Sequence, residues 1–255
     1  MDKTAQGYVK SSIENRLETI EFFHPSHNSL PSLLLAKLAS TITEAGQNEE
    51  VTLIVLQSAG NRTFCAGASF DELVAIEDKT QGLLFFSGFA NVINAIRTCG
   101  KLVIGRVQGK TVGGGVGLAA ACDYCMATKY ASIKLSELAV GIGPFVIGPA
   151  VERKLGLARF SQMAINAKEW FTADWGKEAG LFQEVFDTAD YMDDYLRRFL
   201  ETLVNMNPVA MVELKRVFWS GTENWDVLLK DRAATSGELI LSPIAKKTIQ
   251  GFLKA

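Results

Sequence analysis

A run of glycines is the first candidate for chemistry. The segment GKTVGGGVGLAAACD, residues 109–123, has glycine at four of the five positions 113–117. Glycine inside a helix or strand costs about 0.5–1 kcal/mol relative to alanine, so the run indicates a close approach to the backbone. It follows an apolar, strand-like segment and opens a helix, whose first N–H groups are unpaired and attract negative charge. The segment therefore predicts a site for an anion or for developing negative charge.

One ligand of this kind is a dinucleotide. Gly115, Gly117 and Ala120 match the pattern G-x-G-x-x-G/A, and Glu137 lies 20 residues beyond Gly117, where a ribose-binding acid is expected. However, two or more predicted strands precede this run, whereas the fingerprint normally follows the first strand of its domain. Glu137 also lies within KLSELAVGIGP rather than at the end of a strand. An NAD-dependent oxidoreductase remains an alternative.

The other interpretation is an oxyanion hole, which needs two N–H donors directed at one oxygen. The segment RTFCAGASFDEL, residues 62–73, follows the apolar run 51–57 and contains the small-residue turn Ala66-Gly67-Ala68. Open α/β sheets place their sites at the carboxyl ends of parallel strands, so this turn and the glycine run can present N–H groups to one point. Close packing that tolerates no Cβ explains either segment alone, but explains the pair less well.

The elements that must position these segments alternate between strand and helix up to about residue 188. Buried apolar runs predict parallel strands, and apolar residues spaced three and four apart predict helices. We expect a hairpin over 8–23, strands over 51–57, 101–109, 124–128, 131–138 and 181–186, and helices over 29–46, 71–98, 113–121, 149–166 and 172–180. Helices alone are expected over 189–206, 207–221, 225–241 and 242–255. The pattern predicts an α/β core over residues 1–188 and a helical region over 189–255.

Composition and charge exclude several classes of protein. The 255 residues are 48% hydrophobic and 21% charged, with a formal net charge of −2, which does not favour nucleic-acid binding. No apolar run reaches the roughly 20 residues of a membrane span, and MDKTAQGYVKSSIENRL lacks the apolar centre of a signal peptide. With four cysteines and no such signal, we expect a cytoplasmic protein that binds neither nucleic acid nor membrane.

The pair Cys122-x-x-Cys125 raises the question of a zinc or redox site. A structural zinc ion needs four ligands, and the remaining cysteines, Cys65 and Cys99, are isolated in the sequence. The pair enters a predicted strand, in which positions i and i+3 face opposite sides. We therefore expect buried, apolar thiols and no metal site.

Five segments together resemble the crotonase superfamily, the enoyl-CoA hydratases and isomerases. FCAGASFDEL (64–73) and GRVQGKTVGGGVGLAAACDYCMAT (105–128) resemble its two signature regions. ASIKLSELAVGIGP and WFTADWGKEAGLFQEVFD resemble its third and fourth regions, and NPVAMVELKRVF resembles a helix of its C-terminal tail. The resemblance implies a crotonase-like spiral of β-β-α turns with a helical C-terminal region, assembled as a homotrimer or a dimer of trimers.

The resemblance also implies a site. It makes the backbone N–H groups of Ala68 and Gly114 the oxyanion donors, which would hold the thioester oxygen of an acyl-CoA. Glu137 matches the later of the two hydratase glutamates and is the expected catalytic acid–base, whereas Gly117 stands at the earlier position. The implied substrate-binding residues are Ala66, Gly67, Gly113, Gly115, Val116, Gly117, Phe145, Phe89 and Lys254. Coenzyme A enters as part of the substrate, and no other cofactor and no metal is implied.

A single acid favours an isomerase over a hydratase, since one glutamate can move a proton between the α and γ carbons. The resemblance implies that the hydratases of the family use two acids to hold the attacking water, whereas its isomerases resemble the one-acid pattern seen here. Enoyl-CoA or methylglutaconyl-CoA-like hydration, acyl-CoA decarboxylation and a non-catalytic CoA-binding subunit remain alternatives, and Asp71 or Glu72 could replace the missing acid. We expect Phe145, Val116 and Phe89 to form an apolar pocket that raises the pKa of Glu137. The segment GIGPFVIGP has no acid, which excludes the nucleophile of the aromatic dehalogenases.

Overall fold

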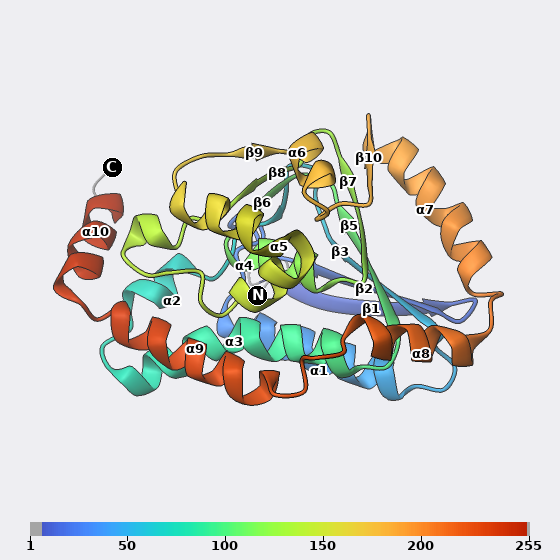
Figure 1. Ribbon diagram of the computed structural model, residues 1–255, viewed down its shortest axis with the longest axis horizontal. Helices are drawn as coiled ribbons and strands as arrows, with labels where there is room; N and C mark the ends of the chain where they lie inside the picture. The colour runs from blue at the N-terminus through green and yellow to red at the C-terminus, as the bar shows by residue number, and fades with distance from the viewer. Residues whose placement is uncertain (1–6, 254–255) are drawn as a thin grey trace.

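Two β-sheets form the frame of the chain in a computed structural model that describes residues 7–253 (Figure 1). The larger sheet has the order β1-β2-β3-β5-β7-β10, with β1 (Tyr8–Glu14), β2 (Leu17–Phe23), β3 (Leu53–Ser58), β5 (Leu102–Val107), β7 (Tyr124–Thr128) and β10 (Glu184–Phe186). The smaller sheet has the order β4-β6-β8-β9, with β4 (Thr63–Cys65), β6 (Lys110–Val112), β8 (Ser132–Lys134) and β9 (Phe171–Thr172). Among the strand pairs formed by residues 7–253, only β1–β2 and β8–β9 are antiparallel.

The chain passes from one sheet to the other in each turn of a spiral. Strands β3, β5 and β7 lie in the larger sheet, and each is followed directly by a strand of the smaller one, β4, β6 or β8. The helical segments that complete these turns are α2 (Phe70–Val74) and α3 (Lys79–Thr98), α4 (Gly114–Ala121), and the short 3₁₀ helix η2 (Leu138–Val140) with α5 (Gly148–Ile165). This arrangement confirms the expected spiral of β-β-α turns.

Alternate residues of the central strands enter two apolar layers, as the period-2 geometry of a strand requires. Ile54 and Leu56 of β3 pack in the main core with α1 (Ser32–Gln47) and α3. Leu53 and Val55 face the other side and pack with Met192 and other apolar residues of α7 (Ala189–Leu203). Because both faces are covered, the strand reads as a continuous apolar run in the sequence.

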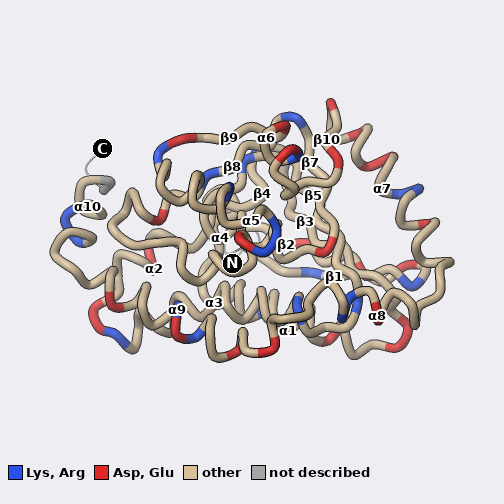
Figure 2. The backbone as a smooth tube through the Cα atoms, in the orientation of Figure 1, with Lys and Arg blue, Asp and Glu red and all other residues tan. Residues whose placement is uncertain are grey.

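The C-terminal helices pack on the α/β part of the chain. They are α7, α8 (Pro208–Phe218), α9 (Trp225–Leu239) and α10 (Pro243–Leu253), and α9 runs along α3 (Figure 1). A Cβ built on Gly82 of α3 would lie 2.7 Å from the Cα of Gly237 in α9, so the two helices touch through their backbones. Acidic and basic residues are interspersed along α7 and α8, in keeping with the small net charge (Figure 2).

The structure differs from the sequence expectations at several elements. The helix predicted over 71–98 is divided into α2 and α3, because Asp78 accepts a hydrogen bond from the Gln81 N–H (2.8 Å) and starts a new helix. The strand predicted over 101–109 ends at Val107, and β6 follows in the other sheet. The strand predicted over 131–138 is reduced to β8, and the helix predicted over 172–180 to α6 (Ala173–Glu178). Within residues 7–253, no helix has the length and apolarity needed to cross a bilayer.

Candidate active site

Three segments meet at the carboxyl ends of neighbouring parallel strands of the smaller sheet. The turn Ala66-Gly67-Ala68 follows β4, the glycine run follows β6, and Glu137 lies three residues after β8. Strand β6 pairs with both β4 and β8, which brings the three segments together. From the sequence, the first two segments were expected directly after the strands over 51–57 and 101–109, which belong to the larger sheet. That placement was wrong, because β4 and β6 intervene, although the principle of parallel strand ends holds.

A cavity of about 160 Å³ lies between these segments and helix α3. Eight of the residues expected at the site line it: Ala66, Gly67, Ala68, Phe89, Gly113, Gly114, Glu137 and Phe145. Gly115, Val116 and Gly117 are not among the residues that line it, so their place in the substrate site stays a prediction. They lie inside the first turn of α4, whose residues 115–121 are all buried. Lys254 lies outside the described residues.

The backbone N–H groups of Ala68 and Gly114 are available as donors. The Leu30 N–H donates to the Gly67 carbonyl (2.8 Å) and the Ser69 N–H donates to the Leu30 carbonyl (3.1 Å). The Ala68 N–H between them points the opposite way, because successive N–H groups of extended backbone alternate in direction. Neither it nor the Gly114 N–H takes part in the turn, loop and cap hydrogen bonds of residues 7–253. A Cβ built on Gly67 would lie 3.6 Å from the Gly114 nitrogen, so the two segments are in contact.

Each glycine of the run is required by a different neighbour. Gly113 has φ +53°, and a Cβ there would lie 3.1 Å from Oε1 of Glu137. A Cβ on Gly114 would collide with the ring of Phe89, and one on Gly115 would lie 2.5 Å from the Cys65 carbonyl oxygen. A Cβ on Gly117 would lie 2.5 Å from Cγ2 of Ile147. The run thus lets α4 begin in contact with Cys65, with the ring of Phe89 and with the carboxylate of Glu137.

Among the residues that the structure describes, Glu137 is the one carboxylate that lines this cavity. Its Oε2 is buried and has no hydrogen-bond partner among the described residues. Burial raises the pKa of Glu137 to about 7, although the backbone N–H groups of Glu137 and Ser136 act in the opposite direction. Phe145 and Phe89 line the same cavity, whereas Val116, expected to help form the apolar pocket, packs in the core instead. Such a carboxylate can exchange protons near neutral pH.

The structure offers no second acid for this cavity within residues 7–253. The side chain of Ile147 occupies the space beside Gly117, where the hydratase pattern has its other glutamate. Asp71 is exposed, and Oε2 of Glu72 accepts hydrogen bonds from the N–H (2.9 Å) and Oγ (2.6 Å) of Ser32. Neither Asp71 nor Glu72 lines the cavity. Neither of the two residues considered as a replacement for the missing acid therefore lies in this cavity.

The dinucleotide interpretation fails for the same geometric reason. Gly115 faces Cys65 and Gly117 faces Ile147, so protein atoms fill the space that a pyrophosphate would need. Glu137 lies beside Gly113, three residues beyond the end of β8. A ribose-binding acid is expected at the end of a strand instead.

The apolar wall of the cavity was not predicted from the sequence. Phe70, Leu73, Phe85 and Phe86, from α2 and α3, line it together with Val140 and Ile142. Helical periodicity identified the α3 residues as apolar, but core and pocket positions look alike in such a pattern. Ser236 of α9 also lines the cavity and is nearly fully buried, and no pattern in the sequence indicated it.

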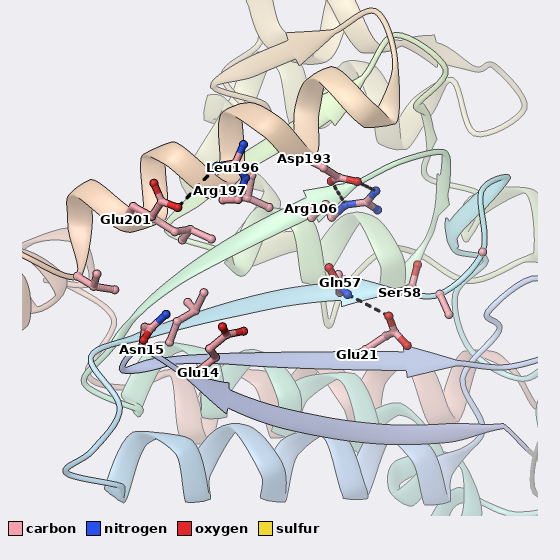
Figure 3. A pocket seen from close by; sticks show the side chains of 15 residues that line it. Glu14, Asn15, Glu21, Gln57, Ser58, Arg106, Asp193, Leu196, Arg197 and Glu201 are labelled. Atoms are coloured by element: carbon pink, nitrogen blue, oxygen red, sulfur yellow. Dashed lines mark hydrogen bonds and ion pairs between the residues drawn. The ribbon is translucent and has the colours of Figure 1, made fainter.

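A larger cavity of about 560 Å³ lies between the larger sheet and α7, on the face of that sheet that α1 and α3 do not cover (Figure 3). Several of its charged side chains form ion pairs or hydrogen bonds with polar neighbours. Nε and Nη2 of Arg106 donate to the two carboxylate oxygens of Asp193 (2.5 and 2.8 Å), and Nε2 of Gln57 donates to Glu21 (2.9 Å). No residue expected at the site lines this cavity. The smaller cavity, with its unpartnered acid, is therefore the better candidate for chemistry.

The cysteine pair is buried, but not in the way expected. A Cβ on Gly105 would lie 2.9 Å from Sγ of Cys125 and 3.0 Å from Sγ of Cys122, so both sulfurs face the same glycine. The expectation of opposite faces was wrong, because Cys122 lies before the start of β7. Both thiols are free, and burial raises the pKa of Cys125 to about 12 and that of Cys122 well above its usual value. No cluster of metal-binding side chains occurs within residues 7–253.

Comparison with known proteins adds three findings. Residues 12–253 match the family model described as enoyl-CoA hydratase/isomerase. The Δ(3,5)-Δ(2,4)-dienoyl-CoA isomerase of Arabidopsis thaliana is 27% identical, covering 86% of this chain and 85% of its own length, and the short-chain-enoyl-CoA hydratase of Clostridium acetobutylicum is 26% identical, covering 89% and 87%. A crystal structure of enoyl-CoA hydratase from Bacillus halodurans superposes with a TM-score of 0.88 at 20% identity, covering 96% of this chain and 99% of that one.

Proposed function

This chain belongs to the enoyl-CoA hydratase/isomerase family, and on that premise we propose that it is an enoyl-CoA isomerase that uses Glu137 as its single proton carrier. The observation that carries the proposal is the buried, unpartnered Oε2 of Glu137 in a cavity that also contains the Ala68 and Gly114 turns. Coenzyme A enters as part of the substrate, and the proposal requires no metal and no separate cofactor.

The proposed reaction moves one proton and one double bond. The Glu137 carboxylate removes a proton from C2 of a 3-enoyl thioester, and the electrons of that C–H bond form a dienolate. Its negative oxygen accepts hydrogen bonds from the N–H groups of Ala68 and Gly114, and one such donor is typically worth about 2.7–4 kcal/mol in the transition state. The Glu137 carboxyl then returns the proton to C4, which leaves a C2=C3 double bond and a carboxylate ready for the next turnover.

Hydration is less well supported because there is no space for a second acid at position 117. In the two-acid pattern the other glutamate would stand at Gly117, and Ile147 fills that space. A water molecule would then have Glu137 alone to orient it and to exchange both protons. A pKa near 7 suits alternating removal and return of a single proton at neutral pH.

The test compares two substrates in D₂O. Purified protein is mixed with 3-hexenoyl-CoA or with crotonyl-CoA, and the enoyl absorbance and the deuterium content of the acyl group are followed together. We expect 3-hexenoyl-CoA to become the conjugated 2-enoyl product, with crotonyl-CoA absorbance unchanged. Glu137→Gln should lower the isomerisation rate about 10²–10⁴-fold.

Other outcomes would redirect or refute the proposal. Loss of crotonyl-CoA absorbance would identify a hydratase and would show that Gly117 does not prevent water activation. Deuterium exchange without a product would retain Glu137 as the base but contradict the isomerase reaction. No change with either substrate, together with CoA binding, would favour a binding subunit.

A further inference from the structure

A second cavity adjoins the candidate active site. It has a volume of about 400 Å³ and, like the first, is lined by Gly143, Pro144 and Phe145. Beyond this shared wall it is bounded mainly by apolar side chains of α5, among them Leu157, Phe160, Ala164 and Ile165. Leu157 and Ile165 are exposed, so its outer end opens to the surface. The two cavities therefore share a wall to which these three residues contribute, and Phe145 has the largest side chain among them.

Hydrogen bonds hold the backbone of the wall, and the ring of Phe145 packs against a glycine. The Phe145 N–H donates to the Gly143 carbonyl (2.8 Å), and the Gly148 N–H donates to the Pro144 carbonyl (2.8 Å). A Cβ built on Gly143 would lie 2.7 Å from the Phe145 ring, so the ring lies directly over that glycine. Removing the ring should therefore open a passage without disturbing the backbone that surrounds Glu137.

The first cavity alone is small for a long acyl chain. At about 160 Å³ it is below the roughly 300–1,000 Å³ typical of pockets that enclose drug-sized ligands. The second cavity is larger and mainly apolar, which suits additional methylene groups.

We propose that Phe145 sets the acyl-chain length: its ring closes the first cavity at a short chain and separates it from the room that a longer chain would use. The substrate is then a short-chain acyl thioester. This inference rests on the proposed function, since it requires the acyl group to occupy the first cavity.

The test measures binding rather than turnover. Calorimetric dissociation constants are obtained for butanoyl-, hexanoyl-, octanoyl- and decanoyl-CoA, with CoA alone as the reference, on the wild-type protein and on Phe145→Ala. Saturated thioesters have no double bond to move, so the result does not depend on the isomerase reaction. We expect the wild type to favour the shorter chains. Phe145→Ala should bind octanoyl- and decanoyl-CoA at least about tenfold more tightly than the wild type does, a typical effect of fitting methylene groups into an apolar pocket.

Three further variants keep the test decisive. Phe160→Ala enlarges the second cavity but leaves the wall in place, so it should not change the preferred chain length. Adding Ser161→Trp to Phe145→Ala refills the second cavity and should remove the gain for long chains while butanoyl-CoA still binds. Phe145→Leu gives a smaller opening and a smaller gain if Phe145→Ala does not fold.

Two results would overturn the inference, and they can be told apart. If the wild type binds butanoyl-CoA better than CoA but Phe145→Ala and Phe145→Leu leave the chain-length profile unchanged, Phe145 does not limit the chain and the proposed function stands. If no acyl-CoA binds any variant better than CoA alone, the acyl group does not occupy the first cavity, and the proposed function fails as well.

Discussion

At the scale of single residues, the candidate site is defined by one carboxyl group without a partner. Buried carboxylates in folded proteins are normally hydrogen-bonded or paired with a cation, because an uncompensated charge is costly to bury. Glu137 has neither for its Oε2, yet it lies beside two backbone turns with free N–H groups. A group kept in this state at a loss of stability is typical of functional sites, where perturbed pKa values concentrate.

The pH dependence of the reaction follows from the raised pKa of Glu137. The proposed base must be ionised to remove the C2 proton, and burial raises its pKa to about 7. We expect kcat/KM for 3-hexenoyl-CoA to rise with pH and to level off above about pH 7. An exposed glutamate would instead give a profile that is already flat from about pH 5, given its ordinary pKa near 4.3. Such a flat profile would exclude Glu137 as the base.

The same pKa predicts a gain of stability when the charge is removed. Between the unfolded pKa of about 4.3 and the folded pKa of about 7, the unfolded chain releases a proton that the folded chain retains. Glu137 therefore lowers stability progressively as pH rises through this window. We expect Glu137→Gln to unfold at higher urea concentration than the wild type at pH 8, with the difference shrinking towards pH 4. A variant that is less stable than the wild type at both pH values would contradict this.

At the scale of elements, the long and buried segments were predicted, whereas the short strands β4 and β6 beside the site were not. Strands β3 and β5 were predicted because both of their faces are buried and their sequences are continuously apolar. Strands β4 and β6 have three residues each, too few to show a period, although they precede the two turns whose N–H groups are the proposed donors. The break between α2 and α3 was missed because the cap at Asp78 lies inside a stretch of otherwise helical spacing.

The site itself was predictable only in part. The turn at Ala68, the glycine run and Glu137 could be named from motifs and the family resemblance, and the structure places all three around one cavity. The packing of Gly117 against Ile147 could not be predicted, because Ile147 lies 30 residues further along the chain and approaches Gly117 only in the folded protein. Similarly, Ser236 reaches the cavity from the helical tail.

The contact between α4 and Ile147 leads to a prediction about two-acid chemistry. Gly117→Glu alone would force a side chain against Ile147, and such overpacking costs about 1–3 kcal/mol. We expect this single variant to be less stable and to gain no hydratase activity. Gly117→Glu with Ile147→Ala should recover stability and allow crotonyl-CoA to be hydrated measurably, as followed by absorbance at fixed pH. Ile147→Ala alone is the matched control and should hydrate nothing. If Gly117→Glu alone hydrates crotonyl-CoA, Ile147 does not exclude the second acid.

At the scale of the whole molecule, one buried carboxylate connects the helical tail to the α/β core. Asp123 lies two residues beyond the end of α4, and its Oδ2 accepts hydrogen bonds from Nζ of Lys215 in α8 (2.6 Å) and from the Val103 N–H of β5 (2.8 Å). Its Oδ1 accepts from Nε1 of Trp219 (2.8 Å). Both charged side chains are only 3% exposed. The helix that begins at Gly114 thus ends where the tail is attached.

This arrangement predicts a large and specific loss of stability for Lys215→Met. Removing one partner of a buried ion pair typically costs about 3–5 kcal/mol, because the other charge stays buried without compensation. The control is Lys79→Met, which breaks an exposed ion pair with Glu238 and should cost at most about 1 kcal/mol. Urea unfolding at pH 7 measures both. Since Lys215 does not line the cavity, the pH midpoint of kcat/KM should stay at the wild-type value under native conditions. Equal losses of stability in the two variants would show that Asp123 is adequately held by Trp219 and Val103 alone, and that the ion pair is not what attaches the tail.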